Sequence, residues 1–146
     1  MQWDASKYAG FTPADAAAEP WISVNPNHVE INAAEEFDDP DSVYTFYKKL
    51  IAMRHNSATI STGEWHLLAA DSDQVYAFTR TNGDDTILVV VNLTDRSAAL
   101  PSDVAELLSD GVNESQVLLS TYDAMHSVKS IAHGELARWE GVVIQL

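Results

Sequence analysis

The segment from residue 74 to 93 constrains the fold most, because its sequence predicts two adjacent strands joined by a tight turn. Residues 74–80 alternate, with Val75, Ala77 and Thr79 on one face and Tyr76 and Phe78 on the other. Asn82-Gly83 follows, which is the signal for a tight hairpin turn. Residues 86–93 then form a β-branched, nearly continuous apolar run that is typical of a central strand. An antiparallel sheet therefore has to form around this hairpin.

Further short strand candidates surround the hairpin, with turn residues between them. They cover residues 64–69, 97–100, 116–120, 130–132 and 142–146. Many short strands separated by turns favour an antiparallel β-sandwich. We therefore expect an all-β domain over residues 59–146 and a chain that is mainly β.

The first 39 residues follow neither the helical nor the strand period. Prolines and asparagines interrupt them, yet they hold Trp3 and Trp21, two of the four tryptophans. A structureless stretch of this length is unusual in a compact free-standing domain. Aromatic side chains in so long a loop indicate that it packs on something large.

A helix of about four turns is predicted over residues 40–55. Acidic residues and Pro40 lie at its start, and basic residues lie at its end. An apolar stripe at helical spacing runs along it: Val43, Phe46, Tyr47, Leu50, Ile51 and Met53. Of these we expect Phe46, Tyr47, Leu50 and Ile51 to be buried. Residues 1–58 are thus a loop and one helix, which cannot close a core of their own.

Composition excludes several classes of partner and chemistry. The formal net charge of −14 is spread along the chain and opposes binding to nucleic acid or to anionic membranes. No apolar run is long enough to span a bilayer, and the first ten residues do not resemble a signal peptide. Cysteine is absent, which fits a reducing compartment. We therefore expect a cytoplasmic protein.

No catalytic, cofactor-binding or metal-binding residue can be assigned from a motif. The five histidines, at positions 28, 55, 66, 126 and 133, have no zinc spacing, and no nucleophile elbow or phosphate-binding loop occurs. One cluster of carboxylates invites a metal interpretation: Glu35, Glu36, Asp38, Asp39 and Asp41. Its irregular spacing favours helix capping and a solvated face instead. No cofactor is expected.

Four aromatic side chains in the β half are candidates for stacking on sugar rings: Trp65, Tyr76, Tyr122 and Trp139. Aromatic residues are also common in strands because they pack well there, and this structural interpretation is favoured.

The first 54 residues resemble the α-amylase superfamily, glycoside hydrolase family 13, in its oligo-1,6-glucosidase and α-glucosidase branch. The resemblance rests on a series of motifs in order: residues 1–4 (MQWD), 9–12 (AGFT), 20–27 (PWISVNPN), 30–32 (EIN), 41–43 (DSV) and 47–54 (YKKLIAMR). Gly63 and the strands at 75–80 and 89–93 also fit that family's C-terminal domain. Two features depart from the pattern: His28 stands where a tyrosine is usual, and residues 109–133 have no clear counterpart.

The resemblance implies a (β/α)8 barrel followed by a β domain. Residues 1–58 would be the end of the barrel, with its last loop and helix, and residues 59–146 would be the C-terminal domain. The family's nucleophilic Asp, acid/base Glu, stabilising Asp and substrate-holding Arg would all lie upstream of residue 1. The parent would be a retaining glycosidase acting on short α-glucosides, and this chain alone would be inactive.

Two other functions are consistent with the sequence. A free-standing β-sandwich could bind glucans through Trp65 or Trp139, but residues 1–38 would then have no role. The β domain could also serve only to stabilise its neighbour. If the barrel interpretation holds, the partner is the missing upstream barrel. The N-terminal part should then expose an apolar surface and either self-associate or be mobile.

Overall fold

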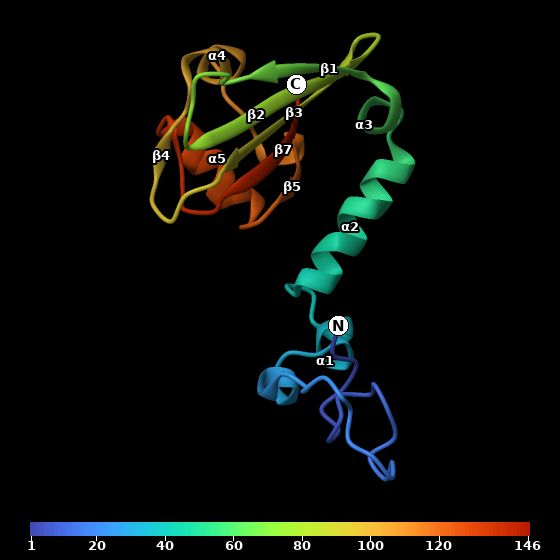
Figure 1. Ribbon diagram of the computed structural model, residues 1–146. Coiled ribbons are helices and arrows are strands. Elements are labelled where there is room, and N and C mark those ends of the chain that lie inside the picture. Colours follow the sequence, from blue (N-terminus) through green and yellow to red (C-terminus); the bar gives the residue numbers. More distant parts are fainter. The chain divides into compact units, whose positions relative to one another are not determined.

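The computed structural model describes residues 1–146, and these fold as two compact units (Figure 1). The first unit is Met1–Met53 and the second is Arg54–Leu146. The two units are considered one at a time below.

The first unit consists largely of irregular chain, as the lack of periodicity predicts. Its regular elements are the 3-10 helix η1 (Pro26–Val29), the helix α1 (Ala33–Asp38) and most of α2 (Val43–Asn56). The chain start lies against this region, because the Ala33 and Ala34 N–H groups donate to the Gln2 and Trp3 carbonyls at 2.9 and 3.0 Å. The Gln2 side chain also donates to Asn27 Oδ1 at 2.9 Å.

Asn32 organises the entry into α1. Its side chain is buried, accepts a hydrogen bond from the Glu35 N–H at 3.1 Å and donates to the His28 carbonyl at 2.9 Å. Asn32 is thus the N-cap of α1 and also holds the end of η1. Polar side chains, rather than a hydrophobic core, fix the backbone of this unit.

The predicted helix is present as α2, but it begins at Val43, so Pro40 precedes the first turn. Ser42 Oγ accepts from the Thr45 N–H at 3.1 Å and so caps the start of the helix. The expected burial of the apolar stripe is wrong for Tyr47 and Ile51, which are 62% and 54% exposed. Phe46 and Leu50 are half-buried. Val43, at the start of the stripe, is 67% exposed.

The second unit is built on one five-stranded antiparallel sheet of order β1-β2-β3-β7-β5. Its strands are β1 (Glu64–Leu68), β2 (Val75–Asn82), β3 (Asp85–Asn92), β7 (Gly141–Gln145) and β5 (Val117–Ser120). A second ladder joins β4 (Ala98–Ala99) and β6 (Glu135–Leu136). The remaining elements are α3 (Ala58–Thr62), α4 (Ser102–Leu107), η2 (Glu114–Gln116) and α5 (Ala124–Ala132).

The central hairpin is confirmed. β2 and β3 pair from Val75↔Asn92 to Asn82↔Asp85, and Gly83 takes the left-handed conformation, with φ +63°, in the turn. β3 lies between β2 and β7, in the middle of the sheet, as its continuous apolar run predicts. The alternation in β2 is confirmed as well, because Val75, Ala77 and Thr79 are buried and Tyr76 is exposed.

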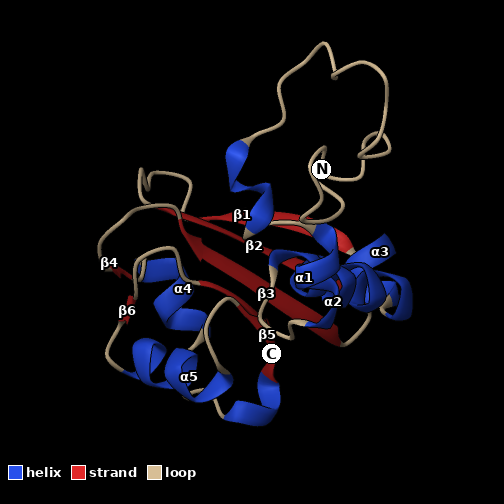
Figure 2. Ribbon diagram, turned by 90° about the horizontal axis from the view of Figure 1, so that it is seen from below, coloured by secondary structure: helices blue, strands red, loops and turns tan.

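One face of the sheet forms the hydrophobic core with a second layer (Figure 2). The sheet contributes Val75, Ala77, Leu88, Val90, Val142 and Ile144, and the second layer contributes Ala98, Val104, Leu108, Ile131 and Leu136. That layer consists of the β4–β6 ladder with α4 and α5, so two helices take the place that a second large sheet would have in a sandwich.

The strand predicted at residues 130–132 is wrong, because these residues end α5. Asp123 caps this helix by accepting from the His126 N–H at 2.7 Å, and Ser127 and Ile131, one turn apart, are buried. A short apolar run is ambiguous between strand and helix, and the aspartate was the signal that distinguishes them.

Candidate interaction surfaces

The acidic residues at 35–41 cap and brace the start of α2. Glu36 Oε2 accepts from the Tyr44 N–H at 3.1 Å, and Asp39 Oδ1 accepts from the Asp41 N–H at 2.9 Å. Nowhere in the chain do three His, Asp or Glu side chains gather in a way that could hold a metal ion. No helix is both long and apolar enough to cross a bilayer.

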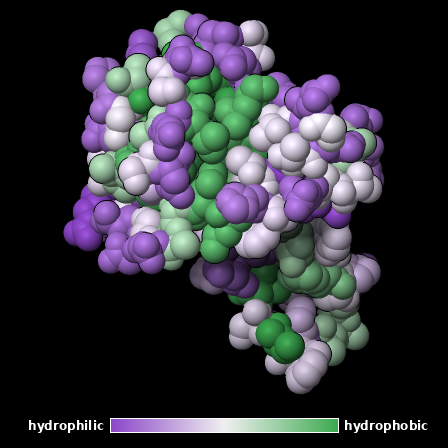
Figure 3. Space-filling view, turned by 90° about the horizontal axis from the view of Figure 1, so that it is seen from above, coloured by the Kyte–Doolittle hydropathy of each residue, from purple (hydrophilic) through white to green (hydrophobic).

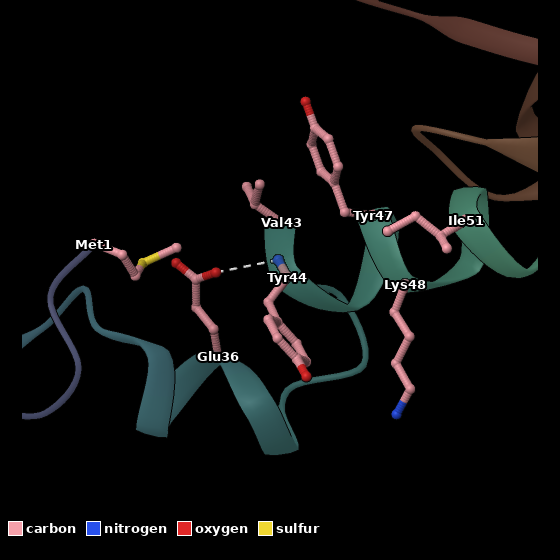
Figure 4. Close-up of a pocket in the computed structure, with 7 residues that line it drawn as sticks. All are labelled: Met1, Glu36, Val43, Tyr44, Tyr47, Lys48 and Ile51. Carbon is pink, nitrogen blue, oxygen red and sulfur yellow. Dashed lines mark hydrogen bonds between the residues drawn. The ribbon is translucent and has the colours of Figure 1, made fainter.

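An open apolar cavity of about 500 Å³ lies beside the first half of α2 (Figure 4). Its lining residues are Met1, Glu36, Val43, Tyr44, Tyr47, Lys48 and Ile51. The only carboxylate among these residues, that of Glu36, already accepts a hydrogen bond from the Tyr44 N–H. The cavity therefore offers apolar surface rather than a set of polar groups that would orient a small ligand.

A second cavity of about 400 Å³ lies in the irregular segment. It is lined by residues 20–25 together with Gln2 and Phe11. Trp21, one of the motif residues, is 95% exposed beside it. Elsewhere in this unit, hydrogen bonds from Ser6 lower the pKa of the Asp4 carboxyl. The motif residues thus include large aromatic side chains that nothing in this unit covers.

Two of the predicted sugar-stacking residues lie together on the sheet. Trp65 and Tyr76 flank Phe78, with ring centroids 6.4 and 5.6 Å from that of Phe78. The rings are inclined to Phe78 by 39° and 52°, so they pack on one another as a hydrophobic cluster. They do not form the flat platform on which a sugar face would stack.

The other two predicted sugar-stacking residues, Tyr122 and Trp139, lie apart from this cluster. Tyr122 stacks on the ring of His126 at 4.3 Å, and its hydroxyl donates to the Arg138 carbonyl at 2.9 Å. Trp139 is exposed in a turn with φ +56°. Tyr122 is thus a packing residue of the α5 region. The structure does not bring the four predicted side chains into one binding face.

The sheet face opposite the core is apolar in its own right. Pairing places one apolar residue of every strand in a single row across it: Leu67, Phe78, Val89, Val143 and Leu119. Trp65, Tyr76 and Val91 flank this row on the same face. We call these eight residues the outer sheet face. Exposed apolar side chains are also visible as a broad patch in the space-filling view of Figure 3.

Helix α3 covers one end of the outer sheet face. The Arg80 guanidinium donates to the Gly63 and Thr59 carbonyls at 2.7 and 3.3 Å, and the Thr59 hydroxyl donates to Asp85. Arg80 and Asp85 point to the outer side of the sheet, as does Ile87, which is nearly fully buried. Gln145 of β7 donates to the same Asp85 carboxylate at 2.6 Å. These polar contacts fasten α3 to β2 and β3.

Sequence reasoning missed two buried polar centres in the second unit. Asn92 donates to the Arg96 and Ala137 carbonyls at 2.7 and 2.8 Å, and it accepts from Thr94 N and Oγ1 at 3.0 and 2.8 Å. The pattern Asn92-Leu93-Thr94 was the available signal, because asparagine and a nearby hydroxyl often form such local turns. It serves folding and not ligand binding.

The second missed centre is Glu140, the one charged residue that is fully buried. Its carboxylate accepts from the Ser127 hydroxyl and from the Ala137 N–H, both at 2.7 Å. His126 Nε2 lies 3.9 Å from Oε2, and Ser120 extends the network to Ser127 at 2.8 Å. No sequence signal distinguishes Glu140 from the other carboxylates. Through Ser127 it joins α5 to the start of the last strand.

Two family models match consecutive parts of the chain. Residues 1–63 match the α-amylase catalytic domain, and residues 65–110 match the maltogenic amylase C-terminal domain. The boundary between the matches falls at the end of α3, where β1 begins. The chain belongs to the α-amylase superfamily, glycoside hydrolase family 13.

Among individual proteins of this family, the chain is similar to several α-1,6-acting glucosidases. The oligo-1,6-glucosidase of Parageobacillus thermoglucosidasius is 34% identical over 148 residues, which cover 100% of this chain and 24% of that protein. The glucan 1,6-alpha-glucosidase of Streptococcus dysgalactiae subsp. equisimilis is 37% identical over 105 residues, covering 72% of this chain and 19% of that protein. The chain spans about a quarter of the length of the first of these relatives.

A comparison with solved structures also finds a member of this family. The trehalulose synthase MutB from Pseudomonas mesoacidophila MX-45 matches with a TM-score of 0.73 and 35% identity, over 99% of this chain and 24% of that one. The fold expected from the resemblance, a barrel end followed by an antiparallel β domain, is thus found in the chain.

Proposed function

We propose that this chain is the C-terminal portion of a retaining α-glucosidase that acts on short isomalto- or malto-oligosaccharides. The observation that carries the proposal is the pair of matches in order, an α-amylase catalytic domain over residues 1–63 and an amylase C-terminal domain over residues 65–110. In the full-length protein, residues 1–58 complete the barrel and residues 59–146 form a β-sandwich-type domain that stabilises it.

Under this proposal the catalytic residues lie in the upstream barrel and not in this chain. Barrel active sites draw their residues from the ends of several strands, and a retaining pair of carboxyl groups must lie about 5–5.5 Å apart across the sugar. The carboxylates at residues 35–41 cap helices, and Glu140 is sealed in the core. The partners are therefore the upstream barrel and, in the full-length protein, an oligosaccharide. We place that protein in the cytoplasm, bound to neither nucleic acid nor membrane.

A free-standing sugar-binding module has less support. Its aromatic candidates are split between separate places, and the rings of Trp65 and Tyr76 are tilted against Phe78. Such a module would also leave the catalytic-domain match of residues 1–63 without a role.

Expression of the complete reading frame that contains this sequence tests the proposal. The purified full-length protein should hydrolyse isomaltose, maltose or p-nitrophenyl α-glucoside with retention of the anomeric configuration. A well-folded full-length protein that turns over none of the three, or that inverts the configuration, would contradict the assignment.

A further inference from the structure

We propose that His126 and Glu140 form a proton-operated clamp, which holds α5 against the start of the last strand more tightly when the His126 ring is protonated. The inference goes beyond the proposed function and does not depend on it. Its starting point is the carboxylate of Glu140, which is fully buried just before β7. A buried charge is costly unless a partner compensates it.

The Glu140 carboxylate has hydrogen bonds but no permanent counter-charge. Its two oxygens accept from the Ser127 hydroxyl and the Ala137 N–H, both at 2.7 Å, and both donors are neutral. No lysine or arginine nitrogen lies within 4.0 Å of it. The one basic group at this distance is His126, whose Nε2 lies 3.9 Å from Oε2. A neighbouring cation therefore balances the charge of Glu140 only when the imidazole holds its second proton.

A neutral His126 ring leaves this contact unsatisfied. Its Nε2 is buried and has no hydrogen-bond partner, because 3.9 Å is beyond hydrogen-bond distance. Protonation turns Nε2 into a charged donor beside the carboxylate, and opposite charges at this separation attract each other strongly where water is excluded. The His126 side chain as a whole is 40% exposed, so the ring can still exchange a proton with water.

The neighbouring groups keep the ring in this position. The Tyr122 ring stacks on it with the centroids 4.3 Å apart, and the Tyr122 hydroxyl donates to the Arg138 carbonyl. Asp123 Oδ1 accepts from the His126 N–H, so a second carboxylate favours positive charge on this side chain. The remaining charged side chains of α5 and of the segment up to β7 are exposed and form no ion pair: Lys129, His133, Glu135 and Arg138.

This contact should make the second unit more stable at the acidic end of the range in which histidine titrates. Histidine changes its charge between about pH 5 and pH 8. The protonated ring gains the carboxylate as a partner only in the folded chain, so folding favours the protonated form. The added stability is therefore present at the acidic end of the range and is lost as the pH rises.

Urea unfolding at about pH 5.5 and about pH 8, followed by the NMR signal of the Ile131 methyl groups in the core, tests the clamp. The variant His126→Phe keeps a ring to stack on Tyr122 but cannot take up a proton. Between the two pH values, the unfolding equilibrium constant of the unchanged chain should rise roughly three- to tenfold more than that of His126→Phe. His66→Phe is the control, because His66 is exposed and has no ion pair, and it should behave like the unchanged chain.

Glu140→Gln removes the charge that the proposal requires. In this background, His126→Phe should no longer alter the pH dependence. If Glu140→Gln does not fold, the carbon NMR signal of the Glu140 carboxyl group in the unchanged chain supplies the same test. That signal should shift in step with protonation of His126 and should lose this shift in His126→Phe. The proposal is overturned by a pH dependence that His126→Phe leaves unaltered, by one of opposite sign, by an effect that persists in Glu140→Gln, or by a Glu140 signal that does not follow His126.

Discussion

At the scale of single residues, polar side chains in the second unit join segments that are far apart in sequence. Asn92 connects the end of β3 to residues 96 and 137, and Glu140 connects α5 to the approach to β7. Buried groups of this kind matter because removing one partner leaves another group without a hydrogen bond and away from water.

Replacement of Asn92 by alanine measures this contribution. The Ala137 carbonyl would lose its 2.8 Å donor and the Arg96 carbonyl one of its donors, so we expect the free energy of unfolding to fall by at least about 2 kcal/mol. Asn113→Ala is the matched control, because Asn113 also caps a turn but is exposed, and it should cost about 1 kcal/mol. Urea unfolding followed by tryptophan fluorescence checks both, and equal losses would contradict the account.

The sequence predicts residue roles well where a side chain obeys a local rule. Gly83 in the turn and the alternating burial of β2 are both recognisable from pattern. Glu140 could not be recognised, because its burial depends on Ser127 of α5, which is near it only in the folded unit. The partial exposure of Tyr47 and Ile51 was also missed, since a pattern shows which face is apolar but not whether anything covers it.

At the scale of elements, the contact between α3 and the sheet is close. A Cβ on Gly63 would lie 2.4 Å from the Thr59 carbonyl oxygen and 3.0 Å from that of Thr81. Only glycine allows the last turn of α3 to meet β1 and β2 at this distance. The Arg80 guanidinium then reaches the carbonyls of Thr59 and Gly63.

Gly63→Ala should therefore displace α3 from the sheet and weaken the Arg80 contacts. The control is Gly111→Ala, where φ is +83° but no atom lies within 4 Å of the new Cβ, so only backbone strain of roughly 1–2 kcal/mol is expected. We predict that Gly63→Ala lowers the free energy of unfolding more than Gly111→Ala does. Chemical denaturation compares the two, and the reverse order would refute the steric argument.

The exposed stripe of α2 gives a prediction that depends on which protein is measured. In the 146-residue chain, Tyr47→Ser and Ile51→Ser remove side chains that are more than half exposed, so stability should change by no more than about 0.5 kcal/mol each. In the full-length protein, where we propose that the barrel covers them, each should cost roughly 1.5–3 kcal/mol. Lys49→Ser, also exposed, is the control and should have little effect in both. Thermal unfolding separates the cases, and small effects in both proteins would argue against coverage.

At the scale of the whole molecule, the two units differ in what holds them. The second has a continuous core shared by the sheet and its covering layer. The first is held mainly by hydrogen bonds from Gln2 and Asn32, and it leaves Trp3, Phe11 and Trp21 more than half exposed. A unit with so little buried apolar surface opens readily on its own.

Limited proteolysis with sedimentation tests this difference. Cleavage should begin within residues 1–38 and leave a resistant product that starts near residue 59. At micromolar concentration the intact chain should either self-associate through its exposed apolar side chains or show this early cleavage as a monomer. A monomer whose first 38 residues resist protease would mean that the first unit needs no partner.

The central claim is that this chain belongs to a glucosidase yet holds none of its catalytic groups, and the most direct measurement is turnover by the chain itself. The purified 146-residue chain is assayed on maltose, isomaltose and p-nitrophenyl α-glucoside beside the full-length protein at equal molar concentration. The account predicts hydrolysis by the full-length protein and none above the buffer blank by the chain alone. Turnover by the chain, in a preparation proved free of contaminating glucosidase, would contradict it.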